Sequence, residues 1–497
     1  MKRADQLKAI SQTQKWDIVI IGGGATGLGA ALDAASRGFK TLCIEKIDFS
    51  KGTSSRSTKL IHGGVRYLEQ GNFSMVRSAL MERWFLLKNA AFNTKKIPFI
   101  LPVYSWWRYL YYGFGLILYD LLSGKFSIGK TKFLTKKTVV SKIPEIRQKS
   151  LKGGIMYYDG QFDDSQICLA LARTAIAKGA TVINHMSAES FLYEESTLSG
   201  VQIRDTLNND IYEIKAKTVI NATGVFADEL ILRDNPKHHR IVSPSQGIHL
   251  VVDKKYHDTD YAMLIPKTTD GRILFAVPWH NKVVIGTTDT KTLTVSEEPE
   301  ATGEEIQFVL DNFNRYINTH LTVDDIRSVF TGLRPLVKMK NIQSTADLVR
   351  DHTIVVSESG LVTITGGKWT TYRKMARDVI NKAISTGNLS FRRCRTRSIK
   401  LIMGKKVVSD ESSELLHPDF PFTKSDILDA IHHEMACTLE DILARRIRLL
   451  FLDVRIALEI APLVCRVLQK ELGHDELWYD SQLMIFRSLA KQYLPKE

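Results

Sequence analysis

Cysteine is scarce in this chain of 497 residues. Five cysteines occur, an odd number, and no two of them have the C-x-x-C spacing. This pattern excludes a disulfide framework and a zinc site of the paired-cysteine kind, and it indicates a reducing compartment. The adjacent His432 and His433 do not suggest a metal site either, because neighbouring residues face different sides of a helix. We therefore expect no bound metal.

Long apolar runs are absent as well. Residues 1–15 are polar and contain no apolar segment of the kind found in a secretory signal. The most apolar stretch, residues 109–119, is about half of the roughly 20 residues that a membrane-spanning helix needs. Internal repeats and low-complexity segments are also missing from the sequence. Because the chain is longer than one hydrophobic core normally allows, we expect two or three domains.

Acidic residues are in the minority, and the formal net charge is +14. Basic residues cluster at 132–142, 392–400 and 445–448, and each cluster is either a solvated face or a surface for an anionic partner. Aromatic residues crowd positions 106–119 among leucines and isoleucines. Aromatic rings with polar edges near lysines suit an anionic membrane surface, although a core helix with a crowded aromatic face has the same pattern.

The most informative motif follows an apolar run at residues 18–21, which predicts a buried parallel strand. Gly22, Gly24 and Gly27 then form the G-x-G-x-x-G pattern of a strand-to-helix turn. The first glycine permits the tight turn, the second lets a pyrophosphate approach the backbone, and the third lets the helix pack closely on the sheet. The next predicted strand ends at Glu45, whose carboxylate can hold ribose hydroxyls. The motif therefore predicts FAD or NAD rather than NADP.

The remaining sequence contains two kinds of strand pattern, followed by a helical region. Apolar strand patterns recur at 180–184, 218–224 and 361–367, as in a parallel sheet. Residues 240–335 instead alternate in short β-like segments, which predicts an antiparallel sheet inserted into the α/β layer. From residue 422 to the end the pattern is helical. The dinucleotide-binding domain is therefore expected to be discontinuous.

Residues 53–69 are dense in hydroxyl side chains and glycines and contain one histidine. A loop of this composition can hydrogen bond to a cofactor at close backbone approach. The segment resembles the FAD-dependent, respiratory glycerol-3-phosphate dehydrogenases. The resemblance covers nearly the whole chain in the right order, through residues 154–164, 221–224, 285–289, 332–336, 366–373 and 434–441.

With this resemblance the predicted fold class is α/β: a Rossmann-like FAD-binding domain with an inserted antiparallel β-rich substrate domain and a C-terminal helical domain. The FAD-binding domain is expected at 1–90, 151–240 and 336–390. The substrate- and membrane-facing domain is expected at 91–150 and 241–335, and the C-terminal helical cap domain at 391–497.

The resemblance also implies the cofactor-binding residues. Gly22, Gly24, Gly27 and Glu45 would hold the ADP half of FAD. The loop from Thr53 to Leu60 would lie along the pyrophosphate and the flavin, and two later glycine segments would close around the cofactor. The residues implied in this second group are Thr53, Ser54, Ser55, Ser57, Lys59, Leu60, Gly224, Gly367 and Thr370.

Four further residues, His62, Arg66, Arg334 and Lys368, would converge on the substrate near the flavin. Glycerol 3-phosphate combines a phosphate dianion with a secondary alcohol at C2. Arginine offers bidentate contacts to phosphate, so Arg66 and Arg334 are the phosphate candidates, with Lys368 a third clamp or a stabiliser of developing alkoxide. Histidine has the pKa range of a base near neutral pH, so His62 is the preferred base, and Arg334 or Lys368 are the alternatives.

We therefore expect oxidation of sn-glycerol 3-phosphate to dihydroxyacetone phosphate by hydride transfer from C2 to flavin N5, with electrons passed to a membrane quinone. The aromatic stretch and the positive charge favour a cytoplasmic protein peripherally associated with the anionic inner face of the cytoplasmic membrane. A cytosolic oxidase that uses oxygen is the first alternative. A basic, FAD-carrying RNA-modifying protein is the second, but no nucleic-acid partner is expected because aromatic-interleaved basic patches are missing. A homo-oligomer is compatible with the sequence.

Overall fold

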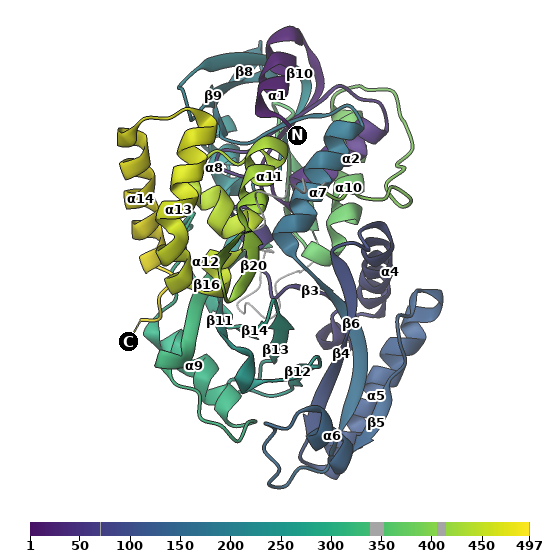
Figure 1. Ribbon diagram of the computed structural model, residues 1–497. Helices are drawn as coiled ribbons and strands as arrows, with labels where there is room; N and C mark the ends of the chain where they lie inside the picture. The colour runs from purple at the N-terminus through teal and green to yellow at the C-terminus, as the bar shows by residue number, and fades with distance from the viewer. Residues whose placement is uncertain (70, 338–351, 405–413, 497) are drawn as a thin grey trace.

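Two large β-sheets, one above the other, form the centre of the molecule in Figure 1. The C-terminal helices flank them on one side, and helices from residues 73–123 flank them on the other. The computed structural model describes residues 1–69, 71–337, 352–404 and 414–496, without the side chains of Arg66 and Glu69.

The upper sheet has eight strands, and its central strands run parallel. Across the sheet they are β17 (His352–Val356), β18 (Val362–Gly366), β10 (Ile211–Asn221), β1 (Trp16–Ile21), β2 (Thr41–Ile44) and β7 (Thr181–Ile183). An antiparallel pair, β8 (Met186–Glu194) and β9 (Thr197–Asp205), extends β10. β1 and β2 are buried on both faces, as their apolar runs predict.

Helices cover both faces of this sheet. Ile18 and Ile20 of β1 pack in a core with α2 (Ala25–Ser36), α7 (Asp164–Ala177) and α10 (Tyr372–Thr386). Val19 and Ile21 point the other way, into a core that includes α1 (Arg3–Gln12) and α8 (Ala227–Asp234). α2 can lie close to its neighbours because its packing face is formed by small side chains, namely Ala30, Ala31, Ala34 and Ala35.

The lower sheet has ten strands and is mostly antiparallel, with one parallel pair between β12 and β4. Its main path is β15 (Thr290–Lys291), β11 (Val242–Asp253), β14 (Lys282–Gly286), β13 (Leu274–Trp279), β12 (Ala262–Ile265), β4 (Thr94–Val103), β6 (Gly153–Phe162) and β3 (Leu60–Ile61). β16 (Ile326–Val337) pairs with β11, and β5 (Lys132–Thr135) pairs with β6.

The two faces of the lower sheet have separate cores. α6 (Lys136–Lys142) and α9 (Gly303–Asn314) contribute to one core. α3 (Val65–Glu69), α4 (Phe73–Asn89) and α5 (Trp106–Ser123) contribute to the other. The strand pairing differs from the expected domain boundaries at β3 and β6, which we assigned to the FAD-binding segments and which hydrogen bond in the lower sheet. The pairing of strands depends on long-range contacts that a local pattern does not contain.

The C-terminal region is helical, as predicted, apart from a small hairpin of β19 (Leu415–His417) and β20 (Phe420–Thr423). Its helices are α11 (Lys424–Glu434), the π-helix η8 (Asp441–Arg446), α12 (Leu449–Leu452), α13 (Val454–Leu472) and α14 (Glu476–Lys491). Their core also includes Val251, Val284 and Phe330 of the lower sheet. The α/β fold with an inserted β-rich domain and a C-terminal helical domain is thus confirmed.

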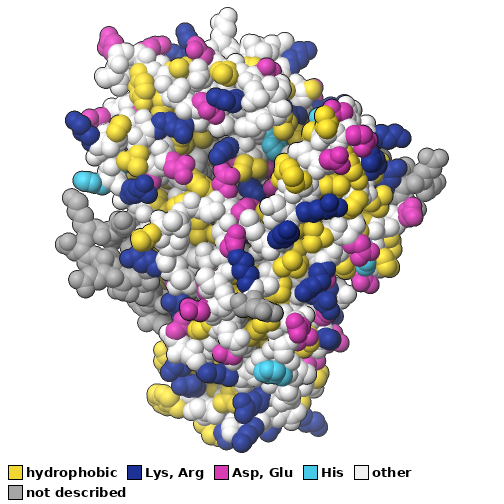
Figure 2. Space-filling model, turned by 90° about the vertical axis from the view of Figure 1, so that its left-hand side faces the viewer, with side chains coloured by type: hydrophobic (Ala, Val, Ile, Leu, Met, Phe, Trp, Pro, Cys, Tyr) yellow, Lys and Arg dark blue, Asp and Glu magenta, His cyan; other side chains and the backbone are white. Residues whose placement is uncertain are grey.

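The basic cluster at 445–448 is not a surface for an anionic partner. Arg445, Arg446 and Arg448 are almost fully buried and pair with acidic residues of other segments. A run of arginines in a sequence predicts an exposed surface, because the local pattern does not contain acidic partners that are remote in sequence. Figure 2 shows lysines and arginines interspersed with acidic and hydrophobic side chains over the face that carries the C-terminal helices. Among the described residues, no helix is both long and apolar enough to cross a membrane.

Candidate active site

A cavity of about 580 Å³ opens between the two sheets. Its walls come from the ends of β1, β2 and β10 in the upper sheet and from β11 and β16 in the lower sheet. The loop of residues 50–58 and the segment 364–372 complete the walls. Parallel strands of a Rossmann-like sheet present their carboxyl ends to such a crevice, which is where nucleotide ligands bind.

The glycine turn has no room for a side chain at the first and third glycines of the motif. Gly22 has a φ of +115°, and an added Cβ would lie 2.6 Å from the Ala222 carbonyl oxygen. A Cβ on Gly27 would collide with the Gly22 carbonyl oxygen. Gly24 lines the cavity, and α2 begins at the next residue. The N-terminus of α2 therefore faces the cavity, as expected for a pyrophosphate site.

Glu45 lines the cavity beside this turn. Its carboxylate accepts hydrogen bonds from the Gly23 amide at 2.6 Å and from the Ile47 amide at 3.1 Å. Each carboxylate oxygen has a second lone pair, so the group can still accept from ribose hydroxyls. Burial raises the pKa of the Glu45 carboxyl. The turn, the helix N-terminus and this acid together fit the ADP half of FAD.

The loop from Thr53 to Leu60 divides into two sides. Thr53, Ser54, Ser57 and Leu60 line the cavity, whereas Ser55 and Lys59 do not. Lys59 Nζ instead donates to Asp164 Oδ2 at 2.8 Å and to the Ser55 carbonyl oxygen at 2.7 Å, and burial lowers its pKa to about 8. The sequence of an irregular loop does not reveal which side chains point inward, so these two were predicted with the rest.

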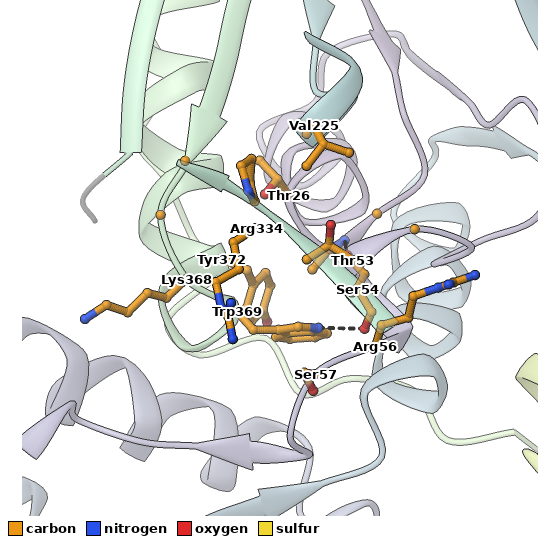
Figure 3. Close-up of a pocket in the computed structure, with 18 of the residues that line it drawn as sticks. Thr26, Thr53, Ser54, Arg56, Ser57, Val225, Arg334, Lys368, Trp369 and Tyr372 are labelled. Carbon is orange, nitrogen blue, oxygen red and sulfur yellow. Dashed lines mark hydrogen bonds between the residues drawn. The ribbon is translucent and has the colours of Figure 1, made fainter. Parts of the chain in front are cut away.

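The opposite wall contains Gly224, Gly367 and Thr370, all on the cavity. It is tied to the loop by Trp369, whose Nε1 donates to the Ser54 carbonyl oxygen at 2.9 Å. Figure 3 shows this indole reaching toward Ser54, while the neighbouring Lys368 extends in the opposite direction.

The substrate candidates come together on this cavity from three distant segments. His62, Arg334 and Lys368 all line it. Arg334 on β16 donates to Thr287 Oγ1 at 3.1 Å and to the Thr288 carbonyl oxygen at 2.8 Å, and it lies 3.3 Å from Asp289.

Lys368 has different surroundings. Lys368 Nζ lies over the Tyr67 ring, 3.5 Å from its centroid. Arg66 belongs to α3, but its side chain lies outside the described residues, so its predicted role stays a prediction.

A further histidine on the cavity was not singled out from the sequence. His249 on β11 is buried, stacks on Phe330 at 4.7 Å, and has its Nε2 2.8 Å from Thr58 Oγ1. Burial, with the positive charges of Lys59 and Arg334, holds the pKa of His249 well below its usual range. Its one sequence signal is a polar residue within an apolar β-segment, which is a weak indication.

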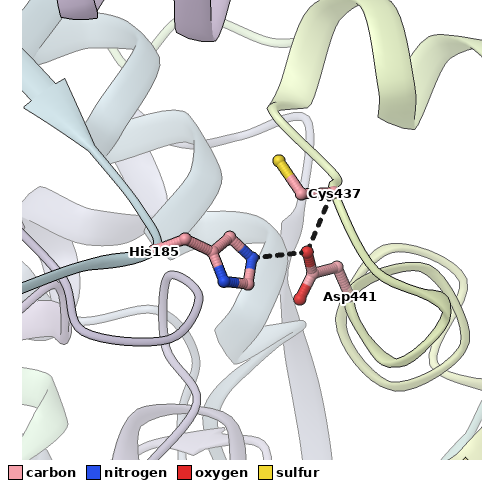
Figure 4. A group of neighbouring side chains, drawn as sticks. All are labelled: His185, Cys437 and Asp441. Carbon is pink, nitrogen blue, oxygen red and sulfur yellow. Dashed lines mark hydrogen bonds and ion pairs between the residues drawn. The ribbon is translucent and has the colours of Figure 1, made fainter. Parts of the chain in front are cut away.

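One group of possible metal ligands lies together in the described residues, namely His185, Cys437 and Asp441 (Figure 4). Asp441 Oδ2 already accepts from His185 Nε2 and from the Cys437 backbone amide, both at 2.9 Å. Its Oδ1 accepts from Arg445 at 2.7 Å. Because a guanidinium opposes a cation at this carboxylate, we assign the group to the ion-pair network between segments rather than to a metal site.

Comparison with known proteins agrees with this architecture. Residues 17–373 match the FAD-dependent oxidoreductase family, and residues 391–477 match the C-terminal domain of alpha-glycerophosphate oxidase. The chain is 38% identical to a probable mitochondrial glycerol-3-phosphate dehydrogenase of Caenorhabditis elegans, over 97% of this chain and 74% of that protein. It is 37% identical to the mitochondrial glycerol-3-phosphate dehydrogenase of Homo sapiens, with the same coverage.

Among solved structures, the glycerol-3-phosphate dehydrogenase from Bacillus halodurans complexed with FAD is similar, with a TM-score of 0.79 and 28% identity. The match covers 99% of this chain and 97% of that one. The cofactor of this fold is FAD, and the glycine turn described above is of the kind that holds a dinucleotide pyrophosphate. The chain therefore belongs to the family of FAD-dependent glycerol-3-phosphate dehydrogenases.

Proposed function

We propose that this protein oxidises sn-glycerol 3-phosphate to dihydroxyacetone phosphate and passes the electrons to a membrane quinone. One observation supports this most strongly. The cavity that contains the glycine turn and Glu45 is also lined by His62, Arg334 and Lys368, which come from three separate segments of the chain. FAD, when bound, supplies the acceptor for the hydride that leaves C2. The protein has to bind the phosphate, orient the C2 hydroxyl and take its proton.

Arg334 is the proposed phosphate ligand. Its guanidinium already lies 3.3 Å from the Asp289 carboxylate, so this side chain meets an anionic group at the cavity wall. A phosphate dianion would compete with that carboxylate and gain bidentate contacts from the same fork of N–H groups. Lys368 would add a point charge on the other side of the cavity.

His62 is the proposed base for the C2 hydroxyl. Its backbone amide donates to Thr370 Oγ1 at 3.2 Å, which keeps the loop close to the predicted cofactor-binding wall. His249 is a poorer candidate, because its lowered pKa makes it a weak base. Histidine is the side chain whose ordinary pKa lies nearest to neutral pH, the range in which a base transfers protons most effectively.

The test of this activity is anaerobic reduction of the bound flavin. We expect glycerol 3-phosphate to bleach the flavin absorbance, and glycerol, lactate and 2-hydroxyglutarate to leave it unchanged at equal concentration. The contrast with glycerol isolates the contribution of the phosphate. A flavin that stays oxidised under saturating glycerol 3-phosphate would rule the proposal out.

The proposed membrane contact is the outer face of α5. One side of this helix is buried through Gly113, Leu116, Tyr119 and Ser123. The other side is exposed although it is apolar, and it contains Trp106, Trp107, Leu110, Tyr111, Phe114, Ile117, Leu118 and Leu121. An exposed apolar face of this size on a monomer marks an interaction surface, and aromatic residues with polar edges suit a lipid interface.

Lysines lie next to this face in the sequence. Lys125, Lys130, Lys132, Lys136 and Lys137 are exposed on the segment that follows α5. Each basic residue near an anionic bilayer contributes about 1 kcal/mol to binding. The proposed location is thus the anionic inner surface of the cytoplasmic membrane, where a quinone is within reach.

Vesicle sedimentation tests this contact with a matched pair of variants. Phe114→Ser on α5 should weaken binding to anionic vesicles, whereas Met484→Ser on α14 should not, although both side chains are 67% exposed. Equal loss of binding for the two variants, or no binding by the wild type, would contradict the proposal.

Oxygen is the second candidate for the electron acceptor. The match of residues 391–477 to the C-terminal domain of alpha-glycerophosphate oxidase favours it. An oxidase would release stoichiometric peroxide from glycerol 3-phosphate and air without any quinone. A quinone-linked enzyme would turn over slowly under these conditions and would accelerate on addition of a quinone analogue.

A further inference from the structure

A buried tyrosine connects α5 to the loop that contains His62. Tyr119 lies on the inner side of α5 and is 1% exposed. Its hydroxyl accepts a hydrogen bond from the Gly63 amide at 2.8 Å. The same hydroxyl donates toward Asp159, 3.0 and 3.1 Å from its two carboxylate oxygens. Gly63 follows His62 directly, so the tyrosine holds the backbone next to the proposed base.

The partner of the tyrosine is itself held in place. Arg83 on α4 donates to Asp159 Oδ1 at 2.6 Å and to the Tyr158 carbonyl oxygen at 3.2 Å. Arg83 and Asp159 are also almost fully buried. Each of these three side chains has a hydrogen-bond partner inside the network, and a different arrangement would break a hydrogen bond in the interior. The hydroxyl of Tyr119 therefore has a defined position and a defined direction.

The loop is closely packed around the contact between Gly63 and Tyr119. A Cβ on Gly63 would lie 2.5 Å from Tyr119 Oη and 2.6 Å from a Leu80 methyl group. On its other side the loop is anchored by the hydrogen bond from the His62 amide to Thr370 Oγ1 at 3.2 Å. The backbone at residues 62 and 63 is thus fixed from two sides, by the predicted cofactor-binding wall and by α5.

We propose that Tyr119 is a positioning residue for the reaction, which fixes the His62–Gly64 loop through the Gly63 amide and so sets the distance between His62 and the substrate. This proposal rests on the proposed function, in which His62 takes the C2 proton. Asp159 and Arg83 orient the tyrosine hydroxyl, and none of the three needs to touch the substrate. The phenol stays protonated throughout, since burial raises the pKa of Tyr119 well above its usual range.

The variant that tests this is Tyr119→Phe, with Tyr109→Phe as its matched control. Tyr109 lies on the same helix, and its hydroxyl donates to the Leu134 carbonyl oxygen at 3.0 Å, away from the cavity. The measured quantity is the limiting rate of anaerobic reduction per bound FAD at saturating glycerol 3-phosphate. Counting only the bound flavin separates slowed chemistry from loss of cofactor.

We expect Tyr119→Phe to slow this rate by about ten- to a hundredfold, because small displacements of a catalytic group have effects of this size. The apparent affinity for glycerol 3-phosphate should change much less, and the Tyr109→Phe rate should equal that of the wild type. A Tyr119→Phe enzyme that reduces its flavin at the wild-type rate would overturn the proposal. If Tyr119→Phe does not fold, the same rate is measured for Arg83→Lys. A slower flavin reduction would support the proposal, and a wild-type rate would overturn it.

Hydrogen exchange separates this proposal from the proposed function. The amide of Gly63 should exchange faster in Tyr119→Phe and at the wild-type rate in Tyr109→Phe, whether or not glycerol 3-phosphate is the substrate. Unchanged exchange would overturn the positioning role by itself. Faster exchange together with a wild-type flavin that glycerol 3-phosphate does not reduce would leave the loop contact supported and the proposed substrate rejected.

Discussion

At the scale of single residues, the proposed chemistry depends on two cations, Arg334 and Lys368, whose surroundings differ. Arg334 is held by backbone and hydroxyl oxygens on one wall of the cavity, which leaves its orientation little freedom. Lys368 lies over the Tyr67 ring instead. A fixed guanidinium suits recognition of a phosphate, whereas an ammonium on a flexible stem can follow charge that develops elsewhere.

Arg334→Ala should therefore raise the apparent dissociation constant for glycerol 3-phosphate by about a hundredfold, as the loss of a charge-assisted contact does. Bound FAD should stay near the wild-type level. Arg327→Ala is the matched control, because Arg327 is on the same strand, pairs with Asp253 and is similarly exposed, 34% against 30%. Titration of flavin reduction against substrate measures the change. Loss of FAD with unchanged substrate affinity would contradict the role of Arg334 as the phosphate ligand.

At the scale of elements, the C-terminal helices support the loop that lines the cavity. Arg448 follows η8 and donates to the Ser55 carbonyl oxygen at 2.8 Å and to Asp164 Oδ1 at 3.1 Å. Lys59 donates to the same two residues, so the back of the loop is held by two buried cations from different parts of the chain. The residues of this loop that face the cavity owe their positions partly to a segment nearly 400 residues away.

Removing one of these cations should loosen the loop. Arg448→Met removes one of the two cations that donate to Asp164 and the Ser55 carbonyl, which costs about 1–3 kcal/mol of stability because Lys59 still donates to both. We expect a lower thermal midpoint and weaker FAD binding. Arg455→Met is the control, because Arg455 is exposed in the same helical region and donates to the Ile326 carbonyl oxygen instead of the loop. Equal effects of the two variants on FAD affinity would refute this support of the loop.

At the scale of the whole molecule, a buried ion-pair network joins the C-terminal helices to the upper sheet. Burial alone would raise the pKa of Glu440, but Arg445 and Lys51 outweigh it and lower the pKa to about 2. Asp441 is also shifted well below its usual pKa, against its own burial, by His185 and Arg445. In return, Asp441 raises the pKa of His185 although burial lowers it. The stability of the folded chain therefore depends on pH on both the acidic and the alkaline side.

The signs of the two dependences are opposite. Carboxyl groups with a lowered pKa stabilise the folded state above about pH 4.5, and this contribution is lost as the pH falls toward 2. His185, with its raised pKa, stabilises below about pH 6.5, and its contribution is lost as the pH rises through its folded pKa. We expect the thermal midpoint to be highest between about pH 4.5 and 6.5. His185→Gln should flatten the alkaline side, and it should also weaken the acid-side dependence, because His185 lowers the pKa of Asp441. An unchanged alkaline slope in this variant would contradict the assignment.

Much of the fold could be predicted from local pattern. The strands 16–21 and 41–44, the glycine turn between them and the helical C-terminal region were recognisable because each has a short-range cause. Burial on both faces needs an apolar run, and a tight turn with a positive φ needs glycine. The aromatic residues of α5 also stand out in the sequence, but a core helix has the same pattern, and only the fold shows which side of the helix is exposed.

The sequence predicted which segments form the candidate site. It predicted less well which side chains of those segments face the cavity. The direction of each side chain in the loop 53–60 depends on what packs behind it, and Ser55 and Lys59 turn toward Asp164 and Arg448. His249 and Tyr119 gave little signal, because their roles depend on neighbours remote in sequence.

The glycines and the acid of the dinucleotide motif are required by backbone geometry and by ribose chemistry, so the sequence was sufficient for them. The basic run at 445–448 shows the opposite case, since its arginines could be assigned to the interior only after folding brought Asp48 and Asp164 beside them. Charges are stable in the interior when partners of opposite sign are within a few ångströms. That condition concerns distances in space, and only the folded chain meets it.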